Sequence, residues 1–143
     1  MAVTSQVEVR RRQITDAIVA AFLENDGLPP WRVHAYPPSQ VVSPCVWVDM
    51  PALRVEPPHM IAEFPVVLQL DGDDQAQVLA FDLVTAVVWD AIQVVDDTAP
   101  VSAATLAADV GGPRARRYVI TATSVLAGQV LCQQASALSL STP

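Results

Sequence analysis

A strand-like segment followed at once by a long helix-like segment, residues 64–95, constrains the fold of this chain most strongly. From Phe64 to Leu70 every second residue is large and apolar, which matches the two-residue period of a β-strand. A short break rich in aspartate follows. Residues 75–95 then form an apolar run with helical spacing that is too long for a strand. We therefore expect a strand, a tight connection and a long helix in this order.

The expected helix carries a wider apolar arc than one covering surface requires. We expect Asp71 or Asp73 to cap its start, because carboxylates accept hydrogen bonds from the first-turn amides. A surface helix needs an apolar arc of about 100°, whereas only a narrow stripe is polar here, formed by Asp82, Thr85, Asp90 and Gln93. A sheet is expected to cover one side of the helix, and a second helix or another subunit to cover a further side.

The composition predicts one folded domain with a large core or a sizeable interface. The chain has 143 residues, of which 52% are hydrophobic and 16% are charged, and this balance excludes a disordered protein. We expect a single domain over residues 1–128 and a flexible tail over residues 129–143. The net charge of -7 argues against a free-standing DNA-binding domain. It is compatible with a surface that DNA passes without binding.

Neither secretion nor membrane insertion is expected from the sequence. The three arginines at residues 10–12 are not followed by an apolar run of the length that a signal peptide needs. The longest apolar segment, residues 75–92, is interrupted by two aspartates. Cys45 and Cys132 do not have the spacing of metal ligands, and we interpret both as reduced thiols of a cytoplasmic protein, with a disulfide between them as the alternative.

The remaining elements follow from periodicity and turn residues. A first helix is expected over residues 6–25, with Ser5 as its N-cap, Glu8 reaching back to it and Gly27 as a left-handed residue at its end. Strands are expected at residues 31–36, 45–50, 64–70, 101–110 and 116–126, with Leu53 and Val55 extending the second strand past a bulge.

Loops and turns separate these elements. We expect loops at residues 56–59 and 96–100, and a tight turn at residues 111–113 that makes a hairpin of the last two strands. The order is therefore α-β-β-β-α-β-β. This order predicts an α+β fold in which two helices pack on one face of a mostly antiparallel or mixed sheet.

No group of residues has the pattern of a catalytic or metal site. The aspartates at residues 71–74 do not match a calcium loop, and we interpret them as the start of the helix. His34 and His59 lack further ligands at close spacing. The chain contains neither a G-x-S-x-G motif nor a glycine-rich phosphate loop with a lysine. We expect no catalytic residue, no metal and no cofactor, and hence a protein that is not an enzyme.

Two arginine clusters stand out on this acidic chain. Arg114, Arg116 and Arg117 lie at the end of the expected hairpin. They would either deter strand pairing as solvated charges or contact an acidic patch on a neighbouring subunit or DNA. The arginines at residues 10–12 are interpreted as charges on the exposed face of the first helix.

The order of elements resembles the tail terminator (minor tail protein U-like) family of long-tailed bacteriophages, particularly those infecting actinobacteria. The resemblance covers about residues 6–126. It depends on a helix ending in a glycine-proline break, followed by the segments Val33-His34-Ala35-Tyr36-Pro37-Pro38, Pro44-Cys45-Val46-Trp47-Val48, Phe64-Pro65-Val66-Val67-Leu68, Leu79-Ala80-Phe81-Asp82-Leu83-Val84-Thr85-Ala86-Val87 and Tyr118-Val119-Ile120-Thr121-Ala122. The head-closure and tail-completion families of the same phage neck have a similar size and architecture.

The resemblance implies a structural role without catalytic residues. Such proteins form a hexameric ring on the head-proximal end of the tail tube, stop its polymerisation and present the surface to which the filled head attaches. The implied partners are further copies of the chain, the tail tube protein and the head-tail connector or head-closure protein, while genomic DNA passes through without sequence-specific binding. The implied location is the virion tail, after assembly in the host cytoplasm.

Contact residues and alternative roles complete the expectation. We expect the contacts with other subunits or partners to involve Arg114, Arg116, Arg117, Pro57, Pro58, His59, Asp82 and Asp90. One alternative is a head-closure or tail-completion protein of the same neck. The other is a small cytoplasmic ligand-binding domain or enzyme, which would have a polar pocket beside residues 71–74 or beside His34.

Overall fold

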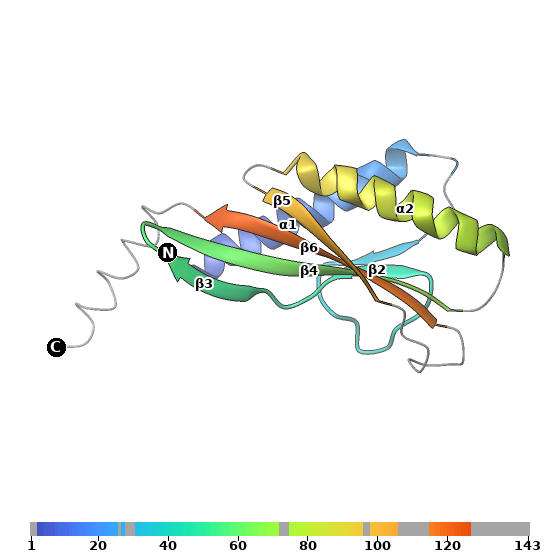
Figure 1. Cartoon of the computed structure of the whole chain (residues 1–143), viewed down its shortest axis with the longest axis horizontal. Helices are drawn as coiled ribbons and strands as arrows, with labels where there is room; N and C mark the ends of the chain where they lie inside the picture. Colours follow the sequence, from blue (N-terminus) through green and yellow to red (C-terminus); the bar gives the residue numbers. More distant parts are fainter. Residues whose placement is uncertain are drawn as a thin grey trace.

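The computed structural model describes residues 3–25, 27, 31–71, 75–95, 98–105 and 115–126. Its elements, in chain order, are α1 (Val3–Glu24), β1 (Arg32–His34), β2 (Cys45–Val48), β3 (Ala52–Glu56), β4 (His59–Asp71), α2 (Gln75–Gln93), β5 (Thr98–Thr105) and β6 (Ala115–Leu126) (Figure 1). The α+β class and the order of the elements are confirmed. The second expected strand is divided into β2 and β3.

The strands form one mixed sheet in the order β1-β2-β4-β6-β5. β1 and β2 are parallel, and the other described pairs are antiparallel. The central strand β4 pairs along one edge with both β2 and β3. Between these two pairings the Asp49 amide donates a 2.7 Å hydrogen bond to the Pro65 carbonyl, so the ladder continues across the gap. β2 and β3 therefore act as one bent strand, as the expected extension through Leu53 and Val55 implied.

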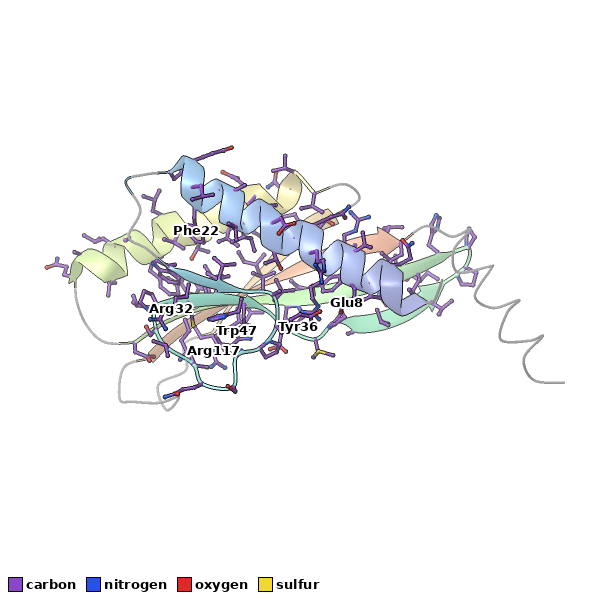
Figure 2. The ribbon with its side chains drawn as sticks, turned by 180° about the vertical axis from the view of Figure 1, so that it is seen from behind. Glu8, Phe22, Arg32, Tyr36, Trp47 and Arg117 are labelled. Carbon is purple, nitrogen blue, oxygen red and sulfur yellow. The ribbon has the colours of Figure 1, made fainter. Side chains whose placement is uncertain are left out.

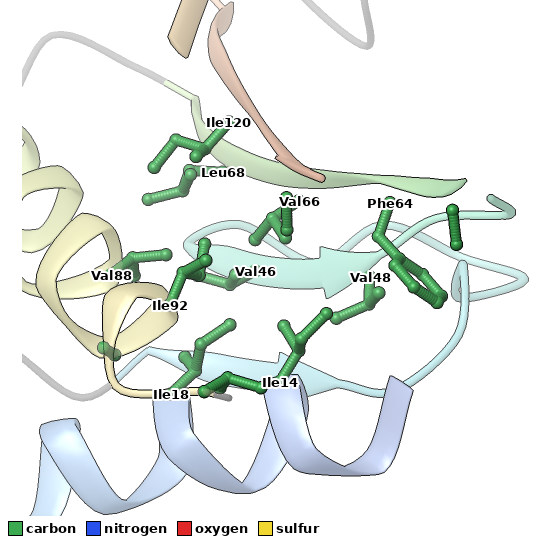
Figure 3. Close-up of a cluster of buried hydrophobic side chains, with 14 of the residues drawn as sticks. Ile14, Ile18, Val46, Val48, Phe64, Val66, Leu68, Val88, Ile92 and Ile120 are labelled. Carbon is green, nitrogen blue, oxygen red and sulfur yellow. The ribbon is translucent and has the colours of Figure 1, made fainter. Parts of the chain in front are cut away.

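Both helices pack on the same face of the sheet, as expected (Figure 1). Alternate residues of the long strands point toward the helices, because successive side chains of a strand point to opposite faces. Phe64, Val66 and Leu68 of β4 are fully buried in this way. Figure 3 shows how they meet residues of both helices and of the neighbouring strands, among them Ile14, Ile18, Val46, Val48, Val88, Ile92 and Ile120.

The face of the sheet opposite the helices carries a smaller apolar cluster. Cys45 and Trp47 of β2 and Val67 of β4 are buried there, with Val119 packed against them. All four residues of β2 are buried, so this strand is covered on both faces as its continuous apolar sequence predicted.

The expected ends of the two helices differ from the observed ends. α1 begins at Val3, so Ser5 lies inside the helix and is not its N-cap. Gly27 does not have a left-handed backbone; instead, the Asn25 amide and side chain donate to the carbonyls of Phe22 and Ala21 and end the helix. Asp71 is the last residue of β4, and its carboxylate accepts a hydrogen bond from the Gln69 side chain, while residues 72–74 before α2 lie outside the described part of the chain.

Two strand boundaries also differ. β4 begins at His59, which pairs with Glu56, so His59 belongs to a strand and not to a loop. Residues 98–100, expected in a loop, open β5, where the Thr98 hydroxyl lies 2.8 Å from the buried Ser124 hydroxyl. Pro100 is tolerated because β5 is an edge strand. Asp73, the turn at residues 111–113, Cys132 and the tail at residues 129–143 lie outside the described residues.

Candidate functional site

One side of α2 remains uncovered. The sheet covers the side formed by Phe81, Val84 and Val88, all of which are buried. The helix α1 provides the expected second cover, beside the C-terminal half of α2. There the two helices line a groove of about 230 Å³ formed by Ala21, Glu24, Asn25, Val87, Asp90, Ala91 and Val94. In Figure 1 the N-terminal half of α2 extends beyond the end of α1.

Two leucines are exposed on this extension. Leu79 is 69% exposed and Leu83 is 56% exposed, and they lie one helical turn apart. Asp82 and Asp90, both expected as contact residues, are exposed on the same side of the helix. The Asp82 carboxylate accepts a long hydrogen bond of 3.4 Å from the Tyr118 hydroxyl. These four residues, Leu79, Asp82, Leu83 and Asp90, are called the α2 face below.

The α2 face combines apolar area with uncompensated negative charge. No residue of α2 is basic. A soluble monomer rarely leaves large adjoining apolar side chains exposed unless they bind something. The chemistry of this face suits a partner that offers apolar and cationic side chains.

A buried arginine fastens α1 to the sheet. Arg11 is only 1% exposed. Its Nη1 atom donates hydrogen bonds of 2.7 Å to the carbonyls of Ala35 and Val48, and Nη2 donates one of 3.2 Å to the Asp49 carbonyl. The guanidinium also lies 4.6 Å from the centre of the Tyr36 ring. The interpretation of residues 10–12 as exposed charges is therefore wrong for Arg11, and Arg12 alone of the three is fully on the surface.

The residues around Arg11 reach the surface beside β1. The Tyr36 hydroxyl donates a short hydrogen bond to the Glu8 carboxylate, which raises the pKa of Tyr36 above its usual value. Glu8 also forms an ion pair with Arg11 at 3.5 Å. Figure 2 shows Glu8 and Tyr36 together below α1. The sulfur of Met50, a residue that is 65% exposed, lies 3.9 Å from the Arg11 Nη2 atom.

Arg117 has partners within the chain. Its side chain donates two hydrogen bonds to the Gln69 Oε1 atom, one of them at 3.0 Å, and its guanidinium lies 5.5 Å from the centre of the Trp47 ring (Figure 2). The backbone of Arg116 pairs with that of Leu70 in the sheet. Arg114 and the side chain of Arg116 lie outside the described part. Arg117 is therefore the member of this cluster whose side chain the structure describes, and it contacts residues of its own chain.

The other expected contact residues lie away from the α2 face. Pro57 and Pro58 form the exposed turn between β3 and β4, and His59 follows it at the start of β4. Figure 1 places this turn at the end of the molecule opposite the start of α2. Two separate surfaces therefore carry the expected contacts.

The residues expected under the enzyme alternative do not form a described pocket. Besides the groove between the helices, a hollow of about 550 Å³ lies at the end of α2, lined by Gln93, Val94, Val95, Thr98, Ala99, Thr123 and Val125. Neither His34 nor Asp71 lines these two hollows. Burial raises the pKa of the Cys45 thiol, and nearby Asp71 raises it further, so this cysteine is the buried strand residue that its position predicted. Among the described residues no cluster of three or more His, Cys, Asp or Glu could hold a metal ion.

Comparisons with known proteins add no relative. No protein-family model matches the chain, and no curated protein matches its sequence. Among the described helices, none has the length and apolar character needed to cross a membrane. The functional conclusion therefore depends on the fold and on the surfaces described above.

Proposed function

We propose that this chain is a structural virion protein that caps the head-proximal end of a phage tail tube as a hexameric ring. The ring ends polymerisation of the tube and forms the surface to which the head attaches. The observation that carries this proposal is the α2 face, where Leu79 and Leu83 are exposed on a helix that is otherwise packed against the sheet and α1. A contact between neighbouring copies would cover such a surface.

The fold and the charge are consistent with this role. The chain has the α+β order that the resemblance implies, with both helices on one face of the sheet. The edge strands β1 and β5 offer backbone groups with which a neighbouring subunit can pair. The net charge of -7 is multiplied around a ring, so the resulting channel repels DNA and lets the genome pass without binding.

Two further partners follow from the position of the ring. Its lower surface meets the tail tube protein, and its upper surface meets the head-tail connector or head-closure protein. The exposed turn at Pro57 and Pro58, with His59 beside it, projects at one end of the molecule and is the segment that we assign to one of these contacts. The protein then resides at the head-proximal end of the virion tail.

The direct test is the length of tail tubes. When the purified chain is added to polymerising tail tube protein, electron microscopy should show shorter tubes with a ring at one end. The double variant Leu79→Gln/Leu83→Gln should lose this effect, because it removes the apolar part of the α2 face. Leu23→Gln, which changes an exposed leucine of α1, is the matched control and should cap tubes normally.

Deletion of the gene separates the proposed role from its nearest alternative. A phage without a tail terminator builds tails of uncontrolled length. A phage without a head-closure or tail-completion protein builds tails of normal length that fail to join heads. Normal tail length in the deletion, together with unchanged tube length in the purified system, would exclude the proposed role.

A further inference from the structure

We infer that the α2 face of one copy docks on a specific surface of the next copy, formed by Arg12, Tyr36 and Met50. This second surface is called the Arg12 face below. The inference rests on the proposed ring and names the two surfaces that meet in it. The contact is head-to-tail, because two different surfaces of the same chain are joined.

The Arg12 face offers exposed aromatic, thioether and cationic side chains, which the α2 face lacks. Met50 is more than half exposed, and Tyr36 is nearly half exposed. Tyr36 and Met50 both touch the buried Arg11 guanidinium, so they lie together beside the first half of α1. Tyrosine, methionine and arginine are enriched where protein interfaces are buried.

Arg12 supplies an exposed positive charge at this place. It lies one helical turn after Val9 and is exposed, and no hydrogen bond or ion pair of its side chain is found within the described part of the chain. Because Arg11 is buried, the surface of the segment from Val3 to Thr15 carries the charges of Arg10, Arg12 and Glu8, whereas α2 contains two aspartates and no basic residue. The first half of α1 and the exposed side of α2 are therefore opposite in charge.

Because the two faces are opposite in charge, we assign a second copy of the chain as the partner of each face. An α2 face placed against another α2 face would bring four carboxylates together, which like-charge repulsion opposes. Against the Arg12 face, the carboxylates of Asp82 and Asp90 instead approach a guanidinium, a favourable ion pair. The two leucines then cover the exposed parts of Tyr36 and Met50.

The positions of the two faces allow the contact to repeat. The α2 face lies on the outer side of the helix layer, where α2 extends past α1 (Figure 1). Of the Arg12 face, Figure 2 labels Tyr36, which lies below α1 and follows β1 in the chain. One copy can therefore use both faces at once, and a head-to-tail contact of this kind generates a closed ring when its rotation closes.

Two variants that each destroy one face test the pairing. Leu79→Gln/Leu83→Gln alters the α2 face, and Arg12→Glu/Met50→Gln alters the Arg12 face. All four residues are exposed, so both variants should keep the wild-type circular dichroism spectrum and unfolding midpoint. The control variant Leu23→Gln/Arg32→Glu changes an exposed leucine and an exposed arginine outside both faces.

Sedimentation velocity at high protein concentration gives the readout. We expect the wild type and the control variant to form assemblies larger than a dimer, and each face variant alone to remain monomeric. An equal mixture of the two face variants should form a dimer and nothing larger, because each variant retains the face that the other has lost.

Several results would overturn the pairing. They are a wild type that stays monomeric at every concentration, a face variant that assembles like the wild type, a face variant that pairs with itself, and a mixture that stays monomeric. The tube-length assay distinguishes this failure from failure of the proposed function. If the chain caps tubes but does not pair head-to-tail, the proposed function stands and the pairing of the two faces is wrong. If the chain pairs head-to-tail but does not cap tubes, the pairing stands and the proposed function is wrong.

Discussion

Arg11 donates hydrogen bonds to three backbone carbonyls at the ends of β1 and β2. Arg11→Met keeps much of the side-chain volume but leaves these carbonyls without their charged donor. Hydrogen bonds to charged groups and buried charges are costly to remove, so we expect the free energy of unfolding to fall by about 3 kcal/mol. Urea unfolding measures this change.

The neighbouring residue provides the control for this substitution. Arg12 is exposed, so Arg12→Met should change the free energy of unfolding by no more than about 0.5 kcal/mol. Equal effects of the two substitutions would contradict the assigned role of Arg11.

Tyr36 gives a prediction that depends on pH. Its hydrogen bond to Glu8 is the largest cause that raises the pKa of Tyr36 from the ordinary 10.0, followed by desolvation and by the Glu8 charge. A raised pKa in the folded state means that Tyr36 contributes stability below its ordinary pKa and loses it as the pH rises through the folded value. Glu8→Ala should therefore lower the pKa of Tyr36, as followed by tyrosinate absorbance.

This titration needs a background with one tyrosine. The chain has two tyrosines, so Tyr118→Phe leaves Tyr36 as the single phenol. The substitution Asp16→Ala removes an exposed acid of the same helix that does not contact Tyr36 and should leave the titration unchanged. An unchanged titration in Glu8→Ala would contradict the hydrogen bond.

The burial of Arg11 could have been recognised from helical spacing. Val7, Arg11, Ile14 and Ile18 lie at spacings of four, three and four residues, so Arg11 falls within the apolar stripe of α1. The run of three arginines suggested one charged surface instead. This is misleading, because adjacent residues of a helix point in different directions. The carbonyls that bind Arg11 come from residues 35, 48 and 49, and their convergence requires the folded sheet.

At the scale of elements, the buried and the exposed side of α2 contribute differently to the free energy of unfolding. Phe81 is buried and contacts the Trp31 ring at 5.5 Å and the Tyr118 ring at 4.6 Å between centroids. Phe81→Ala should lower the free energy of unfolding by about 3–5 kcal/mol because it opens a cavity. Leu79→Ala, on the exposed side of the same helix, should lower it by less than about 1 kcal/mol in the monomer. Thermal or urea unfolding of the two variants at low protein concentration compares them.

A large effect of Leu79→Ala in the monomer would show that this leucine packs within its own chain. Under the arrangement described here, its effect should instead appear in the assembly measured at high concentration. Leu79 should therefore contribute little to the stability of the monomer and much to the association of copies.

Periodicity explains why the long elements were predicted well and the short ones poorly. α2, β4 and β6 have many residues of one period, and their approximate positions followed from the sequence. The continuation of β4 back to His59 depends on pairing with β3 and β6, and β5 begins early because Thr98 meets Ser124. Such pairings join residues far apart in sequence, so local pattern does not contain them. The wide apolar arc of α2 was also predictable, but the exposure of Leu79 and Leu83 depends on where α1 ends in space.

At the scale of the whole molecule, the acidic net charge predicts that the protein does not bind DNA. The formal charge is -7, and the exposed acids include Asp16, Asp82 and Asp90. Because like charges repel, the chain and its assemblies should not retard double-stranded DNA in a gel at physiological salt. The triple variant Asp16→Asn/Asp82→Asn/Asp90→Asn removes three of these charges, changing the formal charge from -7 to -4, and any residual retardation should increase in it.

Binding of DNA by the arginines would give a different result in the same gel. If the arginines at residues 114–117 bound DNA, the wild type would retard it at low salt, and Arg117→Gln would abolish the retardation. Arg117 already has Gln69 and Trp47 as partners, so we expect its substitution to lower stability instead and to leave the DNA lane unchanged. In the ring that we propose, repulsion between the acidic surface and the DNA backbone would let the genome move, since a channel that bound the backbone would hold it in place.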